Sequence, residues 1–394
     1  MEGKLLNKYE ASLLKPPMPC FSIPWFVRGD FERNKFILDS ESVASYGYVT
    51  DYVWRIMATE GKKTTIKDIA REAGVSTATV SRILNNLEGY TGETRKRVMD
   101  VIERRQYRPS AIARGLVSQQ TKTIGVLLPS LSSRFMNTLI EGIESQAQAH
   151  GYSVILCNTD RDGVRTADYL KVLGEKRVDG IIFTSEWVTS EYALALKKLD
   201  VPVVLVATNS WQYSFPSIRT EDKAAAYSAV RYLIEKGHRR IGMVGGTHSD
   251  KIAGIPREEG YFEALEESGI PRDTTMVSHG DFHFASGIRA MQELYERHPE
   301  ITAVFAASDE MALGVLSFAY AHGIRVPEQL SVIGYDDTLD AQMSIPPLTS
   351  IHQPIYEMGA EAVMTLLESQ DAMGKVLPIS ITERDSVCAL RGSE

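Results

Sequence analysis

TIKDIAREAGVSTATVSRILN, residues 65–85, contains two short helical patterns joined by a glycine. Thr65 and Asp68 have the spacing of a capping box, which predicts that the first helix begins here. Gly74 supplies the conformation that a tight turn between helices needs, and Ser76 is suited to cap the second helix. The expected buried stripes are Ile66, Ile69, Ala70 and Ala73 in the first helix, and Val80, Ile83 and Leu84 in the second. The stretch therefore predicts a helix-turn-helix.

The other side of the second predicted helix carries small and hydroxylated side chains. Thr77, Ala78, Thr79, Ser81 and Arg82 all fall outside its apolar stripe. Such a helix can lie close to the floor of a DNA major groove, where hydroxyls reach phosphates and methyl groups reach thymine. An ordinary surface hairpin of two helices is the alternative, but the pattern favours a DNA-reading helix.

Charge is distributed unevenly along the chain, whose formal net charge is −8 over 394 residues. Residues 62–122 contain 13 Lys and Arg against 6 Asp and Glu, a net charge of +7, which leaves −15 for the remainder. This distribution predicts one phosphate-binding module attached to an acidic body. It argues against a protein that binds nucleic acid over its whole surface.

Composition is that of a globular protein, with 43% hydrophobic and 24% charged residues. No apolar run is long enough to span a membrane, and no secretory signal pattern precedes the first motif. The three cysteines, Cys20, Cys157 and Cys388, are scattered and odd in number, which is typical of reduced thiols. We therefore expect a cytoplasmic protein that associates with the nucleoid.

The sequence lacks the motifs of common catalytic sites. No G-x-G-x-x-G, P-loop or G-x-S-x-G pattern occurs, and no His and Cys residues have metal-ligand spacing. His279 and His283 are four residues apart, but the residues between them predict a loop, and a third ligand is missing. We therefore expect no enzyme, no cofactor and no metal site.

From Thr123 onward, apolar strand patterns alternate with helical patterns. The expected strands are TIGVLLP, YSVILC, DGIIFTS, PVVLVAT, RIGMVGG, TAVFAAS and LSVIGYD. Buried strands separated by helices predict parallel sheets covered on both faces. These strands are too many for one unit of about 100–150 residues. We therefore expect two stacked, doubly wound α/β subdomains that meet near residue 221, with late segments crossing back and a cleft between them.

Several motifs occur in the order found in the lactose-repressor family of bacterial transcription regulators, which the chain resembles from about Thr64 to its C-terminus. They are TIKDIAREAGVSTATVSRILN, YRPSAIARGLVS, TKTIGVLLP, VDGIIF, LIEKGHRRIG, ASDEMALG, SVIGYDD and LTSIHQP. Within the family, the chain is most similar to the catabolite-control group. The resemblance implies a homodimeric repressor of carbohydrate metabolism that binds a palindromic operator and is controlled by a small sugar or sugar phosphate.

The resemblance also implies a domain order. Residues 1–60 are an extension of uncertain status: either translation starts at Met57, or the extension is a genuine accessory segment. Residues 61–108 form the all-α helix-turn-helix domain, and residues 109–121 form a hinge helix and linker. Residues 122–394 form an effector-binding and dimerisation domain that resembles periplasmic sugar-binding proteins.

Individual residues are assigned roles by their position in the family's motifs. Thr77 and Ala78 occupy the places that choose bases, and Leu116 occupies the place of a hinge leucine that wedges into the minor groove. The other positions implied to contact DNA are Thr65, Ser76, Thr79, Ser81, Arg82, Asn85 and Arg114. The positions implied to line the effector site are Phe135, Arg257, Phe282 and Asp309.

Two of the effector positions also have plain structural interpretations. Asp309 precedes a helical pattern, and an acidic residue is favourable at a helix N-terminus. Arg257 is followed by Glu258 and Glu259, so an ion pair on the surface is an alternative to ligand binding. The basic residues of a third predicted helix, over 93–106, likewise either cover a solvated face or contact phosphates. They are Arg95, Lys96, Arg97, Arg104 and Arg105.

Departures from the family pattern leave the controlling partner open. PVVLVAT ends in Ala207-Thr208, where many relatives place an acidic residue, and Glu221-Asp222 replaces a common Asp-Asn. A corepressor that is a phosphorylated carrier protein is the alternative to a sugar effector. The helical pattern over 312–323 ends in Ala321-His322, however, where catabolite-control proteins carry Asp-Arg, and this difference weakens the alternative.

Overall fold

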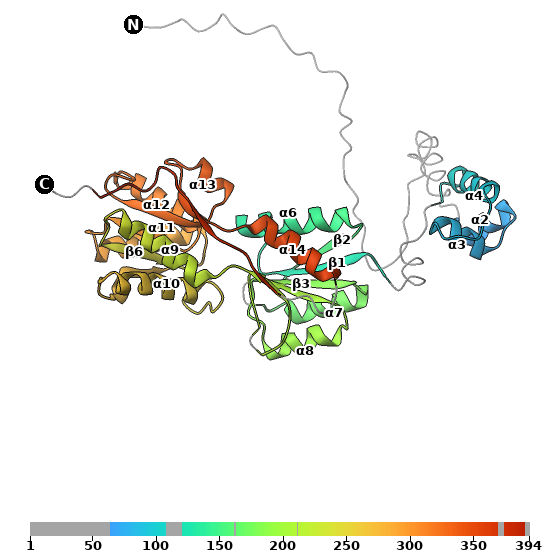
Figure 1. The fold of residues 1–394 in the computed structure, drawn as a ribbon, viewed down its shortest axis with the longest axis horizontal. Helices are drawn as coiled ribbons and strands as arrows, with labels where there is room; N and C mark the ends of the chain where they lie inside the picture. The colour runs from blue at the N-terminus through green and yellow to red at the C-terminus, as the bar shows by residue number, and fades with distance from the viewer. Residues whose placement is uncertain (1–63, 108–119, 161–162, 211, 369–373, 391–394) are drawn as a thin grey trace, which may run out of the picture. The chain divides into compact units, whose positions relative to one another are not determined.

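The computed structural model describes residues 64–107, 120–160, 163–210, 212–368 and 374–390. The chain divides into two compact units, Met1–Arg108 and Pro109–Glu394, which Figure 1 shows as the three-helix part and the larger two-sheet part. The expectations for the N-terminal extension and for the hinge helix lie outside the described residues. Within the described part of the chain, no helix is both long and apolar enough to cross a membrane.

In the first unit, three helices pack around one small apolar core. They are α2 (Ile66–Ala73), α3 (Thr77–Leu84) and α4 (Gly92–Arg104). The fully buried members of this core are Ile69, Ala70, Ala73, Val80, Ile83, Val98 and Val101. The two predicted stripes are therefore confirmed, with Ile66 and Leu84 half-buried at their ends. Removing these apolar faces from water is what holds helices as short as α2 and α3 in place.

The second unit contains two six-stranded sheets, whose orders are β11-β5-β4-β3-β1-β2 and β12-β10-β9-β8-β6-β7. The first sheet consists of β1 (Thr123–Leu128), β2 (Ser153–Asn158), β3 (Gly180–Thr184), β4 (Val203–Val206), β5 (Ser217–Arg219) and β11 (Lys375–Val376). The second consists of β6 (Ile241–Gly245), β7 (Val277–His279), β8 (Ala303–Ala306), β9 (Ser331–Asp336), β10 (Thr349–His352) and β12 (Ser380–Thr382). All seven strands expected from the sequence form.

Pairing in both sheets is parallel among the described strands, with one difference from the expectation. β12 runs antiparallel to β10, with Ile351 opposite Ile381. The reason is the direction from which the chain enters the second sheet. β11 ends at the carboxyl edge of the first sheet, and no helix between β11 and β12 carries the chain round to the amino edge of the second, so β12 starts from the carboxyl edge. The doubly wound architecture expected from the sequence is otherwise confirmed.

Helices cover both faces of each sheet (Figure 1). On the first sheet, α6 (Arg134–Ala149) and α14 (Ile355–Glu368) bury one apolar face, and α7 (Thr166–Lys176) and α8 (Ser190–Lys198) bury the other. On the second sheet, α9 (Asp222–Glu235) pairs with α10 (Gly254–Glu267), and α11 (Phe284–Arg297) pairs with α12 (Asp309–Ala321). A short helix, α13 (Leu339–Met343), follows β9, and a 3-10 turn, η2 (Thr274–Met276), precedes β7.

The chain passes between the two sheets three times. It leaves the first sheet after β5, returns after β10 to form α14 and β11, and leaves again to form β12. Thr220 in the first crossing donates its hydroxyl to Gln353 in the second, at 2.7 Å and fully buried. The crossing segments are therefore tied to each other as well as to the sheets.

Segments that follow the carboxyl ends of the strands bring the two sheets into contact. Arg134, after β1, places Nε 2.7 Å from Asp340 Oδ2 in α13, and its backbone N–H donates to Glu310 at 3.1 Å. Lys251, after β6, lies with Nζ 5.3 Å from the ring centroid of Trp187, after β3. The carboxyl edges of both sheets therefore face one another, and in open α/β sheets this is the edge where ligands bind.

Candidate functional site

The helix-turn-helix is held by its caps. Thr65 and Asp68 exchange backbone N–H bonds, at 3.0 Å to Asp68 Oδ2 and 3.4 Å to Thr65 Oγ1, so the predicted capping box is present. Gly74 has φ of +64°, as the turn requires. Ser76 Oγ accepts from the Thr79 N–H at 3.1 Å and caps α3. Thr65 and Ser76 thus shape the motif, and their contact with DNA stays a prediction.

The outward face of α3 presents the residues predicted to read DNA. Thr77, Ala78 and Arg82 are exposed, whereas Thr79 and Ser81 are half-buried. Asn85 caps the end of the helix, and its amide donates to Ser81 Oγ at 3.4 Å. Among the described residues, Arg82 forms no ion pair, so its guanidinium is available to a phosphate.

The basic face of α4 divides into two groups. Arg105 Nε lies 2.7 Å from Glu72 Oε2 and Arg104 Nη2 lies 3.5 Å from Glu72 Oε1, so these two arginines tie α4 to α2. Arg95, Lys96 and Arg97 are exposed, and no carboxylate in the described part of the chain pairs with them. The second group is therefore the better candidate for phosphate contact. Arg114 and Leu116 lie outside the described residues, and their roles stay predictions.

Arg257, predicted to bind the effector, is buried in the second unit. Its Nε and Nη2 donate to Asp222 Oδ1 at 2.8 and 2.7 Å, and its Nη1 donates to the Ala307 carbonyl at 2.6 Å. The guanidinium carbon lies 3.6 Å from the ring centroid of Tyr335. Burial lowers the pKa of Arg257, but the carboxylate of Asp222 leads the opposing causes, and the net shift is upward. The interpretation as a surface pair with the adjacent glutamates is therefore wrong.

Asp309, the first residue of α12, is also fully buried. Its Oδ2 accepts from Thr338 N and Oγ1 at 2.7 and 3.0 Å, and its Oδ1 accepts from Ser350 Oγ at 2.6 Å. Burial raises the pKa of this carboxyl to about 6, against the hydrogen bonds from Ser350 and Thr338. In this conformation the carboxylate joins α12 to the β9–α13 turn and to β10. An effector would reach it only by displacing one of these donors.

Phe282 and Phe135 are both half-buried. Phe282 has φ of +68°, and its ring lies over Gly246, where a Cβ atom would come within 2.1 Å of the ring. The ring centroid is 5.9 Å from the guanidinium carbon of Arg257, so the structure brings these two predicted residues together. Phe135 belongs to α6 of the first sheet and packs against that sheet's apolar core.

Sequence reasoning missed the partners that organise this region. Asp222 and Tyr335 hold Arg257, and the Tyr335 hydroxyl also donates to Asp222 at 3.2 Å. Asp336 accepts from Gln353 Nε2 at 2.7 Å, and burial raises the pKa of its carboxyl to about 8, although the charge of Arg257 opposes that rise. The sequence did contain one signal for the partner of Arg257. Glu221-Asp222 replaces a common Asp-Asn, so it adds a carboxylate at residue 222, and a buried arginine needs a carboxylate.

Two hollows in the second unit lie elsewhere, at the opposite edge of the first sheet. The larger, of about 500 Å³, is lined by Ile124, Val178 and Pro202, near the amino ends of β1, β3 and β4. The smaller, of about 300 Å³, lies beside Val203 and Pro216. Neither includes a residue of the predicted effector site. We place that site at the carboxyl edges nonetheless, because the crossing connections and the polar network converge there.

Comparison with known proteins gives matches along most of the chain. Residues 65–110 match bacterial regulatory proteins of the lacI family, and residues 121–383 match periplasmic binding proteins and the sugar binding domain of the LacI family. Catabolite control protein A of Priestia megaterium is 42% identical over 82% of this chain and 98% of its own.

Solved structures show the same likeness. The lac repressor dimer bound to operator and an anti-inducer has a TM-score of 0.76 and 30% identity, and the match covers 83% of this chain and 100% of that one. A complex of the regulator CelR with cellobiose has a TM-score of 0.63 and 31% identity, covering 82% and 99%.

A helix-turn-helix unit followed by a body like a periplasmic binding protein defines a ligand-responsive DNA-binding regulator. The chain belongs to the lacI family of bacterial regulatory proteins. Its relatives are transcription regulators and not enzymes.

Proposed function

We propose that the protein represses genes of carbohydrate metabolism by binding a palindromic operator as a homodimer, in the cytoplasm on the nucleoid. The exposed face of α3 is the observation that carries the proposal: it presents Thr77, Ala78 and Arg82, and Arg82 pairs with no carboxylate in the part of the chain that the structure describes. One such helix covers half a site, and a two-fold dimer matches an inverted repeat. The lac repressor dimer bound to operator is a relative whose architecture supports this arrangement.

The controlling ligand in this proposal is a small sugar or sugar phosphate. Phe282 offers a half-buried aromatic face of the kind that stacks on the apolar side of a sugar ring. Arg257, whose guanidinium carbon lies 5.9 Å from the centroid of that ring, is itself fixed by hydrogen bonds to Asp222 and to the Ala307 carbonyl. The likeness to the regulator that was solved with cellobiose supports the same class of ligand.

A phosphorylated carrier protein as corepressor is the second candidate, because catabolite control protein A is among the similar proteins. The end of α12 argues against it. His322 stacks on Phe318 at 4.0 Å between ring centroids, and its Nδ1 lies 2.8 Å from the Phe318 carbonyl oxygen. No arginine stands at this position to pair with a phosphate.

A thermal-shift screen of the full chain against sugars and sugar phosphates tests whether the controlling ligand is a small sugar or a carrier protein. A ligand that binds only the folded state raises apparent stability by RT ln(1 + [L]/Kd), about 2.7 kcal/mol at a hundredfold excess over Kd. The proposal predicts that at least one compound shifts the melting temperature and changes operator affinity in a gel-shift titration. If no compound does both, while a phosphorylated carrier protein alone changes operator affinity, the second candidate replaces the first.

A further inference from the structure

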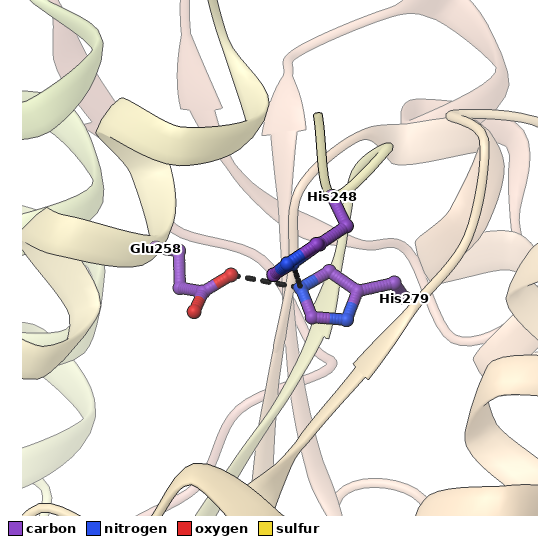
Figure 2. A group of neighbouring side chains, drawn as sticks. All are labelled: His248, Glu258 and His279. Carbon is purple, nitrogen blue, oxygen red and sulfur yellow. Dashed lines mark hydrogen bonds and ion pairs between the residues drawn. The ribbon is translucent and has the colours of Figure 1, made fainter. Parts of the chain in front are cut away.

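Three side chains outside the proposed DNA and effector residues converge at the edge of the second sheet (Figure 2). His248 lies in the loop after β6, Glu258 lies in α10, and His279 is the last residue of β7. One ligand atom from each residue falls within 4.8 Å of the other two. Two imidazoles and one carboxylate form a donor set that binds divalent transition metals.

Glu258 and His248 both contact the same nitrogen atom, Nε2 of His279. His279 Nε2 lies 2.8 Å from Glu258 Oε2 and 3.4 Å from His248 Nδ1. An imidazole nitrogen carries either one proton or one lone pair, so it cannot form a full hydrogen bond to both neighbours at once. A cation at the centre would satisfy both nitrogens and the carboxylate oxygen together.

The spacing suits a tetrahedral ion such as Zn²⁺. With metal–nitrogen and metal–oxygen bonds of about 2.0–2.2 Å, tetrahedral ligand atoms stand roughly 3.3–3.5 Å apart. The two imidazole nitrogens already lie at 3.4 Å. The Glu258 oxygen, 2.8 Å from His279 Nε2, would have to move outward by a fraction of an ångström. Glutamate has enough side-chain freedom for that movement.

The backbone around the cluster is well fixed. Gly245 of β6 pairs with His279 of β7, and a Cβ at Gly245 would come within 3.2 Å of the His279 ring, so this glycine makes room for the imidazole. Asp250 accepts from the backbone N–H groups of Ile252 and Gly254 at 2.8 and 3.1 Å, which holds the turn between His248 and Glu258. Glu258 and His279 therefore stand on a helix and a strand, which position ligands more precisely than loops do, and His248 stands beside a hydrogen-bonded turn.

The cluster is also accessible. The side chains of His279 and Glu258 are 30% and 23% exposed, and His248 is exposed. An ion can therefore enter from solvent, and a fourth coordination position can be filled by water. We propose that His248, Glu258 and His279 bind one divalent transition-metal ion such as Zn²⁺. This site is independent of the sugar ligand, although Glu258 adjoins Arg257 in α10.

The test uses the full chain, purified without a polyhistidine tag and dialysed against a chelator. Cobalt(II) is titrated first, because a tetrahedral site gives visible absorption bands, and Zn²⁺ is then titrated calorimetrically in competition. We expect one ion per chain. Loss of a ligand should weaken binding by more than about tenfold, since even the loss of a residue that only orients a ligand costs about 10–100-fold.

Two variants and one control make the result decisive. His248→Ala removes an exposed side chain whose hydrogen-bond partner among the described residues is His279 alone, so folding should be unaffected while binding is lost. His279→Gln should lose binding as well. His283→Gln is the matched control, because His283 pairs with Glu310 at 3.0 Å in a similar setting, without a third ligand atom in the described residues. Absence of stoichiometric binding, or binding unchanged by His248→Ala and His279→Gln, would overturn the proposal.

Discussion

Arg257 and Asp222 form an ion pair in which two guanidinium nitrogens, Nη2 and Nε, donate to the same oxygen, Asp222 Oδ1, at 2.7 and 2.8 Å. Asp222 is the first residue of α9, directly after the chain crosses from the first sheet to the second. A further bond from Arg257 Nη1 reaches the Ala307 carbonyl at the end of β8. One arginine therefore fixes α10, α9 and β8 at the edge where we place the effector.

Replacement of Arg257 by Met should strongly destabilise the second unit. Asp222 would keep its partly buried charge without a partner, and loss of one member of a buried pair costs about 3–5 kcal/mol. The double variant Asp222→Asn with Arg257→Met should recover part of that loss. Lys223→Met is the control, since its pair with Glu263, at 3.1 Å, is exposed and worth about 0–1 kcal/mol. The free energy of unfolding in urea is measured for the natural chain, the two Arg257 variants and the control. Equal stabilities for Arg257→Met and the control would show that the pair has no structural role.

Thr77 and Ala78 should determine which sequences are bound, while Arg82 should supply affinity. Discrimination by a base-contacting position is about 1–3 kcal/mol per base pair. Replacement of Thr77 or Ala78 should therefore change the motif recovered by binding-site selection. Arg82→Ala should weaken binding to all sequences alike and lower the salt slope by about 1. Recovery of an unchanged motif from both Thr77 and Ala78 variants would contradict the assignment.

His238 should make the second unit sensitive to acid. It is buried between Thr302 Oγ1, at 2.9 Å, and the Cys388 carbonyl, at 3.1 Å, and burial lowers the pKa of its imidazole below the ordinary value. As pH falls, the unfolded chain takes up the proton first, at its ordinary pKa of about 6.5. The contribution of His238 to stability is therefore complete above that pH and is lost as pH falls toward the lower folded pKa.

The measurement is the free energy of unfolding at about pH 7.5 and about pH 5.5, on either side of the ordinary histidine pKa. The natural chain should lose more stability between them than His238→Gln, which cannot titrate. His150→Gln, at an exposed position, should behave like the natural chain. The same loss in His238→Gln as in the natural chain would assign the acid sensitivity to other groups.

The crossing of α6 and α14 should not tolerate a side chain at Gly142. A Cβ there would come within 2.1 Å of the Tyr356 carbonyl oxygen, so the two helices would have to separate. Overpacking of this kind typically costs about 1–3 kcal/mol, and Gly142→Ala should lower the midpoint of urea unfolding accordingly. Glu141→Ala, at the exposed neighbouring position, should change stability by less than about 0.5 kcal/mol. A Gly142→Ala variant as stable as this control would mean that the helices are not packed this closely.

The parts of the fold that could be predicted are those with local signals. Thr65, Asp68, Gly74 and Ser76 specify α2 and α3 through caps and a turn within a dozen residues. The seven predicted strands are runs of four to six residues, and six of them are almost wholly buried; β2, at an edge of the first sheet, is the exception. The missed strands, such as β5, β7 and β11, have two or three residues and too little pattern to be recognised. Their strand geometry depends on pairing with neighbours that lie far away in sequence.

The site was predictable only in its individual residues. Position in a motif identified Arg257, but its partner Asp222 is 35 residues away and Tyr335 lies on another strand. The histidine cluster was missed for the same reason. Sequence spacing drew attention only to His279 and His283, and the loop predicted between them argued against a site, whereas folding brings His279 to His248 and Glu258 and leaves His283 with Glu310. Which side chains come together at such a site depends on packing between segments far apart in the sequence, and residue spacing does not reveal that packing.

A footprint on operator DNA tests most directly the central claim that the protein binds a palindromic operator as a homodimer. A binding site selected from random DNA should show two inverted half-sites, both protected in a footprint, with two chains bound per duplex. Affinity should fall steeply with salt, since each phosphate contact contributes a slope of about −0.9. Protection of a single asymmetric half-site by one chain, or binding without sequence preference, would contradict the account.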